Sequence, residues 1–146
     1  MEIVNQIITN KCIVVPFFLW LIIQIFKFVY ELIVNKKIDF KRLFGAGGMP
    51  SSHSAVVCSE AILVGKALGF DSATFALALT FAGVVMYDAA GVRRAAGKQA
   101  RILNKIVSTP GLTQVEVNEK LTELLGHTPF QVFVGALIGI VVGIII

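Results

Sequence analysis

The sequence predicts an all-α membrane protein: a polytopic helical bundle of about four spans, with surface helices on the cytosolic side. Hydrophobic residues make up 56% of the 146 residues and charged residues only 15%, and the mean hydropathy is +0.83. A soluble domain usually has about a quarter charged residues. The apolar residues occur in long runs, and a helix needs about 20 of them to cross a bilayer. We therefore expect a single integral membrane domain over residues 1–146, with no nucleic-acid partner.

Four apolar runs are the predicted spans, at residues 13–34, 54–70, 73–90 and 129–146. Residues 1–10 read as a short interfacial stretch before a retained span, because no small-residue cleavage site of a signal peptide follows. The second and third runs are separated by a tight turn, where Asp71 or Ser72 can cap the next helix. These two runs are therefore expected to form a helical hairpin.

The basic residues indicate how the bundle is oriented. If all four runs cross the bilayer, the loop 35–53 and the polar segment 91–128 lie on the same side. The positive-inside rule makes that side cytoplasmic, with both termini outside. Surface helices are expected within 91–128, over residues 95–107 and from Thr113 to Leu125, where Thr113 and Glu116 form a capping box. Ten of the thirteen basic residues lie on this side: Lys36, Lys37, Lys41, Arg42, Arg93, Arg94, Lys98, Arg101, Lys105 and Lys120.

The first polar motif on this side is GGMPSSHSA, residues 47–55. Ser51 and Ser52 open a helix, and the free amides of a helix N-terminus bind anions. His53 follows, placed to donate a proton to a leaving oxygen. Ordinary helix capping by the two serines is the alternative interpretation.

The second motif is YDAAGVRRAAGKQA, residues 87–100. Asp88 lies near the end of an otherwise uncharged run, where insertion of a carboxylate costs about 2.5–3.5 kcal/mol. We therefore expect Asp88 to pair with Arg93 or Arg94. Arginine forks match phosphate oxygens well, so both arginines and Lys98 are candidate phosphate ligands. The alternative is that these bases only contact lipid headgroups.

The third motif is GHTPFQVFVGALIG, residues 126–139. His127 directly precedes a capping box in which Thr128 is the N-cap and Gln131 the third helical residue. Small residues at four-residue spacing then permit close helix packing. We favour packing inside the bundle over contact with a second copy in a homo-oligomer. These residues are Gly135, Gly139 and Gly143.

Several embedded polar groups have more than one interpretation. Lys27 and Glu31 are four residues apart and can pair on one helix face. Glu60 lies seven residues after His53, hence about 10 Å deeper on the same face. It could support a site at His53 or pair with Lys27.

The three motifs, in this order, resemble the short divergent branch of the type-2 phosphatidic acid phosphatase and vanadium haloperoxidase superfamily. The resemblance runs from about Gln24 to the C-terminus. It implies that one histidine forms a phosphohistidine while a second protonates the leaving group, with no metal or other cofactor. His127 would be the nucleophile and His53 the acid, and Ser51 with nearby amides would bind phosphate.

The chain also departs from the superfamily pattern. Gln131 stands where an acidic residue would orient the nucleophile, and Leu121 stands where an arginine is usual, so Arg93 or Arg94 would have to substitute. In the first superfamily motif Leu43 replaces a proline. The lysine and arginine of that motif would be Lys36 or Lys37 with Arg42, and Lys27 is another lysine candidate.

These features favour a membrane phosphohydrolase that acts on a lipid phosphate or diphosphate. The competing hypothesis is a non-catalytic membrane protein whose anion site binds lipid headgroups or a partner. A transporter is disfavoured because no inverted repeat is present. The hydrolase hypothesis requires the rings of His53 and His127 to approach one pocket, together with an arginine head and the Ser51–Ser52 amides.

Overall fold

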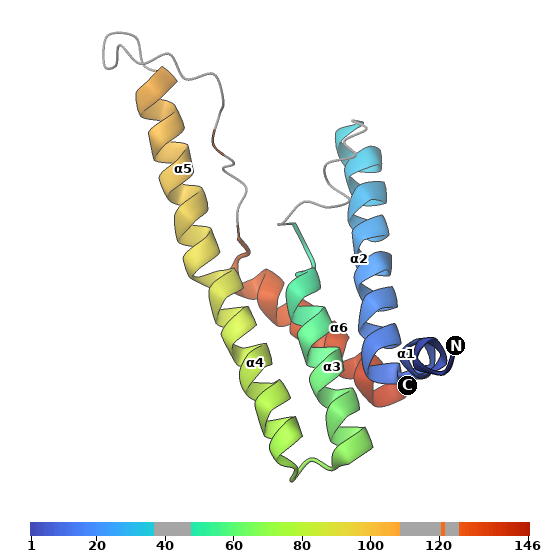
Figure 1. The fold of residues 1–146 in the computed structure, drawn as a ribbon. Helices are drawn as coiled ribbons and strands as arrows, with labels where there is room; N and C mark the ends of the chain where they lie inside the picture. The colour runs from blue at the N-terminus through green and yellow to red at the C-terminus, as the bar shows by residue number, and fades with distance from the viewer. Residues whose placement is uncertain (37–47, 109–120, 122–125) are drawn as a thin grey trace.

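The computed structural model describes residues 1–36, 48–108, 121 and 126–146, and these form helices joined by short connections, with no strand. A helix covers each of the four apolar runs predicted from the sequence. Apart from Leu121, the predicted helix from Thr113 to Leu125 lies outside the described residues. The helices are α1 (Glu2–Thr9), α2 (Lys11–Asn35), α3 (Ser52–Leu68), α4 (Ala73–Ala90), α5 (Val92–Ser108) and α6 (Pro129–Ile145) (Figure 1).

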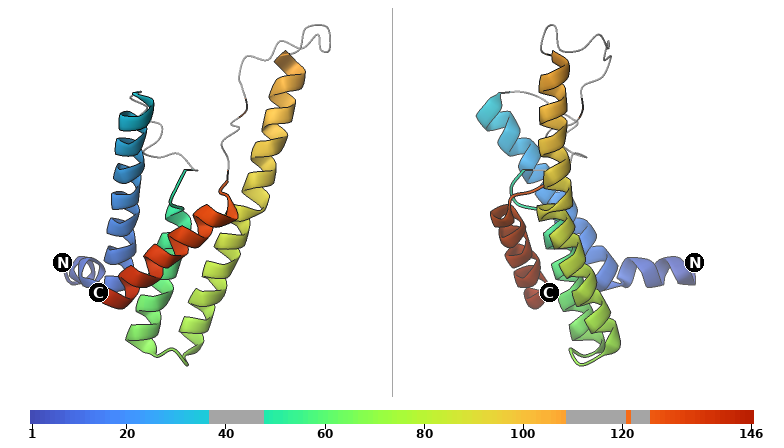
Figure 2. Two further views of the ribbon diagram at one scale, coloured as in Figure 1. Left: turned by 180° about the vertical axis from the view of Figure 1, so that it is seen from behind. Right: turned by 90° about the vertical axis from the view of Figure 1, so that its left-hand side faces the viewer.

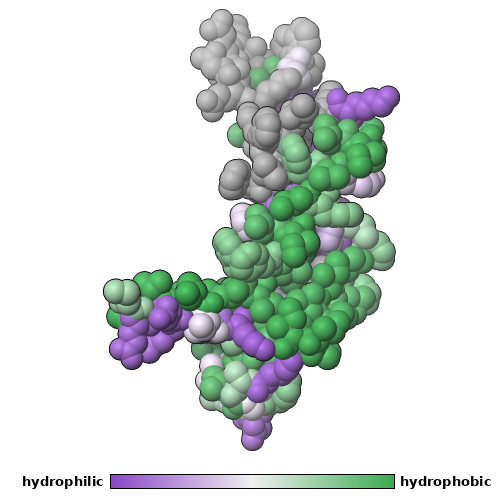
Figure 3. Space-filling model, turned by 90° about the vertical axis from the view of Figure 1, so that its right-hand side faces the viewer, coloured by the Kyte–Doolittle hydropathy of each residue, from purple (hydrophilic) through white to green (hydrophobic). Residues whose placement is uncertain are grey.

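Two described helical stretches are long and apolar enough to cross a membrane. One is Lys11–Val34, and the other is Ala73–Ser108, which joins α4 and α5. The third apolar helix, Pro129–Ile145, is shorter. Figure 3 shows a broad hydrophobic band over the face seen there, with hydrophilic patches toward its ends.

Local capping explains where the helices begin. Ser72 caps α4, since its side chain accepts a hydrogen bond of 3.1 Å from the amide of Phe75. Thr128 and Gln131 form the predicted capping box of α6. The amphipathic α1 runs sideways from the N-terminus of α2 (Figure 2), because Asn10 adopts an extended conformation between the two helices.

The centre of the bundle is α3, which packs against α2, α4 and α6. Its buried residues are mostly small, including Ala55, Ser59 and Ala61, and these allow close contact with α6. The glycines of α6 face α3: a Cβ on Gly135 would overlap the carbonyl oxygen of Ser51. The two remaining glycines of the stripe, Gly139 and Gly143, face Ala55 and Ser59–Ile62 of α3 in the same way. The glycine stripe therefore packs inside the bundle, and self-association stays a prediction.

The helix α5 continues nearly in line with α4 and extends beyond the other helices (Figures 1 and 2). It begins at Val92, directly after Gly91, rather than at residue 95. The starts of α3 and α6 lie beside the junction of α4 and α5, and the middle of α2 lies near them. The three polar motifs and the middle of α2 are thus brought to one level of the bundle.

Candidate active site

Two backbone hydrogen bonds place the third motif against the other two. The amide of Ser51 donates to the carbonyl oxygen of Gln131 at 3.1 Å, which ties the start of α3 to the first turn of α6. The amide of His127 donates to the carbonyl oxygen of Ala89 at 2.9 Å, near the end of α4. The N-termini of α3 and α6 therefore converge, and both present the positive end of a helix dipole to the same region.

The rings of His53 and His127 are neighbours, although 74 positions separate them (127 − 53). Their centroids lie 6.1 Å apart, with the ring planes at 63°. His127 is only 2% exposed, whereas His53 is half-buried. Nδ1 of His53 and both ring nitrogens of His127 are buried without a well-formed hydrogen bond to any described residue. Because buried polar atoms are normally paired, these nitrogens suggest a ligand site.

Burial is the largest cause that lowers the pKa of His127 from its ordinary 6.5 to about 4. The positive charge of Lys27 and the nearby ring of His53 lower the pKa further. The Gln131 side chain and the Gly48 backbone lie close enough to His127 to oppose part of this effect. At neutral pH the His127 imidazole is therefore uncharged, which is the form of histidine that acts as a nucleophile.

Among the lysines that the structure describes, Lys27 from the middle of α2 reaches the histidine pair. It is 8% exposed, and its Nζ donates to the hydroxyl of Ser52 at 3.5 Å. Its charge acts on both imidazoles. Of the other lysine and arginine candidates in this part of the chain, Lys36 is exposed at the C-cap of α2, and Arg42 lies outside the described residues.

Ser51 has a mainly structural set of contacts. Its side chain accepts a hydrogen bond of 3.4 Å from the amide of Ser54 and one of 3.0 Å from the hydroxyl of Ser54. Its amide is bound to Gln131, as described above. These contacts correspond to the capping interpretation of the serines. Binding of phosphate by Ser51 stays a prediction, whereas the Ser52 hydroxyl lies beside Lys27.

Asp88 has the partner that the sequence predicts. Nε of Arg93 donates to Oδ2 of Asp88 at 2.6 Å, and both side chains are more than a third exposed. The charges of Arg93 and Asp88 both act on His53, so this ion pair borders the histidine pair. Arg94 is half-buried and Lys98 is exposed, and the phosphate-binding role expected for them stays a prediction.

Gln131 is engaged in the capping box. Its side-chain Oε1 accepts a hydrogen bond of 3.0 Å from the backbone amide of Thr128. The backbone amide of Gln131 donates to Thr128 Oγ1 at 3.3 Å. The side chain still lies near the His127 ring. The expected role of Gln131, to orient the nucleophile, stays a prediction.

Glu60 lies two turns deeper on α3, where it lines a separate groove with Cys12 and Trp20. Support of the histidine pair by Glu60 stays a prediction.

Two glycines were not recognised as site residues from the sequence. Gly126 has φ +88°, and a Cβ there would overlap the backbone of Arg94, while Gly48 has φ +78° and lies near the stem of Lys27. In the sequence, the only indication of a role at the site was that Gly126 directly precedes His127 and Gly48 lies shortly before Ser51.

The family assignment rests on two comparisons. The model of the Divergent PAP2 family matches residues 8–142, which include the full histidine pair and Lys27. The chain belongs to this family. A relative from Bacillus subtilis (strain 168), the "Uncharacterized membrane protein YuiD", is 40% identical over 84% of this chain and 85% of its own length. No solved structure matches.

Proposed function

We propose that this Divergent PAP2 protein is a phosphohydrolase of lipid phosphates or diphosphates that works through a phosphohistidine on His127. The observation that carries the proposal is the pair of imidazoles with centroids 6.1 Å apart. Rings this close can both contact one phosphoryl group bound beside them. One ring nitrogen then makes a near-attack contact of about 3–3.5 Å with phosphorus, and the other donates a hydrogen bond of about 2.6–3.2 Å to the leaving oxygen.

In the first step, a nitrogen of neutral His127 attacks phosphorus and forms a P–N bond. The P–O bond to the lipid breaks in line, and the leaving oxygen takes a proton from His53. Lys27 and the convergent helix N-termini stabilise charge on the equatorial oxygens, and Arg93 adds to this when it exchanges Asp88 for phosphate. In the second step, His53 accepts a proton from water, which attacks phosphorus, and inorganic phosphate leaves as the P–N bond breaks.

The membrane arrangement is part of the proposal. The helices α2, α3, α4 and α6 cross the bilayer as four spans, and the site lies toward the cytoplasmic face. The lipid chain then stays at the depth of the bilayer's hydrocarbon region while the headgroup reaches Lys27. This arrangement explains why a small phosphatase would need several apolar helices.

The test is phosphate release from lipid phosphates by purified protein in detergent. We expect the native protein to turn over, and His127→Ala and His53→Ala to lose about 100-fold or more of kcat/KM. Thr80→Ala, on the exposed side of α4, is the control and should behave as native. Labelled phosphate from the substrate should remain on the quenched native protein and be absent from His127→Ala. Equal rates in native protein and both histidine variants would refute the proposal.

A second function is supported by a specific observation. The Arg93 side chain is paired with Asp88, and the Gln131 side chain is used in the capping box of α6. Neither group is then committed to catalysis. The competing proposal is a non-catalytic anion site that binds phosphate headgroups of lipids. It predicts that vanadate binds the native protein without hydrolysis of any lipid phosphate.

Vanadate binding distinguishes the roles of the cations under either function. Lys27→Met removes the buried charge at nearly constant length, and we expect vanadate affinity to fall about tenfold or more. Lys105→Met, on exposed α5, is the matched control and should bind as native. Native affinity in Lys27→Met would show that Lys27 does not bind the anion.

A further inference from the structure

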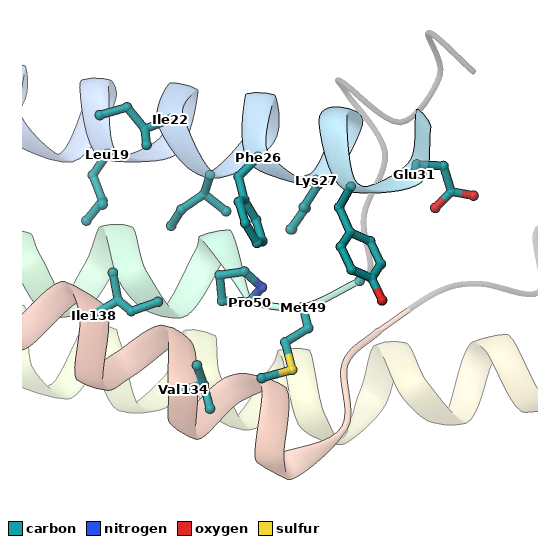
Figure 4. A pocket seen from close by; sticks show the side chains of 12 residues that line it. Leu19, Ile22, Phe26, Lys27, Glu31, Met49, Pro50, Val134 and Ile138 are labelled. Carbon is teal, nitrogen blue, oxygen red and sulfur yellow. The ribbon is translucent and has the colours of Figure 1, made fainter. Parts of the chain in front are cut away.

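A half-open apolar groove runs between α2 and α6 and ends beside the candidate active site. Its volume is about 690 Å³. In Figure 4, Leu19 and Phe26 point from α2 toward α6, Ile138 points back from α6, and Pro50 lies between the two helices. The lining residues are Leu19, Ile22, Ile23, Phe26, Lys27, Tyr30, Glu31, Gly48, Met49, Pro50, Val134 and Ile138.

The groove has chemically different ends. Toward the middle of the bundle its lining is aliphatic, with Leu19 and Ile138. Toward the site it contains Lys27, whose charge acts on His53 and His127. Glu31 lies one turn beyond Lys27, so an anionic group is attracted to the level of Lys27 and repelled from the level of Glu31. This lining fits a molecule with an anionic head and a hydrocarbon tail.

The length of the groove suits a hydrocarbon chain of medium length. From Leu19 to Lys27 the α2 axis advances about 12 Å. An extended hydrocarbon chain advances about 1.3 Å along its axis per C–C bond, since each bond is about 1.5 Å long and the chain zigzags. The groove thus runs alongside about ten carbons. Both α2 and α6 pack on α3 but make few contacts with each other, so the groove lies open between them along this length.

We propose that this groove holds a hydrocarbon chain of the phosphate-bearing substrate and thereby presents the phosphate to the candidate active site. The proposal rests on the proposed function for its catalytic consequence only. The chain leaves a bilayer that is as apolar as the groove, so there is little hydrophobic gain. Contacts in the groove instead orient the phosphate toward Lys27 and the histidines.

The experiment uses full-length protein in detergent, with dodecyl phosphate and water-soluble p-nitrophenyl phosphate as substrates. Ile22→Trp and Val134→Trp add bulk to the two walls of the groove. Leu21→Trp places the same bulk on an exposed α2 position that does not line the groove. We expect the groove variants to lose about tenfold or more of kcat/KM for dodecyl phosphate and to keep native rates on p-nitrophenyl phosphate. Leu21→Trp should keep both rates.

A second readout does not need turnover. A twelve-carbon alkyl phosphate with a photoactivatable terminal carbon should crosslink to α2 near Leu19 or to α6 near Ile138, and Ile22→Trp should reduce this labelling. Labelling elsewhere, or labelling unchanged by both groove variants, would overturn the groove proposal even if lipid phosphates are hydrolysed. Labelling in the groove without phosphate release would instead retain the groove and refute the proposed hydrolase.

Discussion

At the scale of single residues, the site depends on groups that are buried in an uncharged form or held next to opposite charge. His127 is buried and neutral, and Asp88 is neutralised by Arg93. Lys27 retains a polar contact to Ser52 although its stem lies among apolar side chains. The sequence indicated all of these residues as candidates. It did not decide which lysine enters the site, because that depends on where the middle of α2 meets the start of α3.

The lowered pKa of His127 predicts how stability depends on pH. In the unfolded chain this imidazole takes up a proton near pH 6.5, whereas in the folded protein it does so only near pH 4. The unfolded state is therefore favoured as the pH falls from about 6.5 to about 4. We expect His127 to contribute a loss of about 2 kcal/mol between pH 8 and pH 5.

The measurement compares the apparent melting temperature of native protein and His127→Gln in detergent over this pH range. The native protein should lose more stability on acidification than the variant, since glutamine does not titrate. The same shift predicts that phosphohydrolase activity does not fall through protonation of His127 between pH 7 and pH 5. Parallel pH curves for the two proteins would contradict the prediction.

At the scale of helices, the contact between α3 and α6 brings His53 and His127 together. Gly135, Gly139 and Gly143 all face the backbone or side chains of α3. Their four-residue spacing indicated close packing, and this was correct. The sequence alone did not identify the partner helix, because a small-residue face can pack against any helix of suitable shape.

Glycine substitutions test this contact. A Cβ on Gly139 would overlap the backbone oxygen of Ala55, so Gly139→Ala should destabilise the protein by about 1–3 kcal/mol. Gly83→Ala is the matched control, because no atom lies within 4 Å of a Cβ there. It should be neutral or stabilise the helix by up to about 1 kcal/mol. Thermal unfolding of both variants in detergent measures the difference, and equal melting temperatures would argue against the α3–α6 contact.

At the scale of the whole molecule, the polar motifs lie at one level and the α3–α4 turn at the opposite end (Figure 1). Lys66 and Lys11 donate hydrogen bonds to the last carbonyl groups of the chain: Lys66 to Gly143 and Ile144, and Lys11 to Ile146. Cations at a helix C-terminus favour its dipole. The far end of α6 is thus anchored by α2 and α3, while its first turn is anchored at the site.

The proposed orientation predicts opposite accessibility for the two ends. Asp71→Cys lies in the α3–α4 turn and Arg101→Cys lies on α5. In a background with Cys12→Ser and Cys58→Ser, a membrane-impermeant maleimide should label Asp71→Cys in intact cells. It should label Arg101→Cys only after permeabilisation, because the proposed orientation puts the basic side in the cytoplasm. The reverse pattern would show that the site faces outward.

The sequence by itself determined the helical class, the four apolar runs, the helix caps and the residue types of the site. These follow from local pattern and composition, which act over a few neighbouring residues. The tertiary structure decided that the two imidazoles meet, that Lys27 joins them, that Arg93 is bound to Asp88, and that an apolar groove leads to them. Such features depend on packing between helices far apart in the chain, where the shape of each contact surface, rather than local preference, selects the partner.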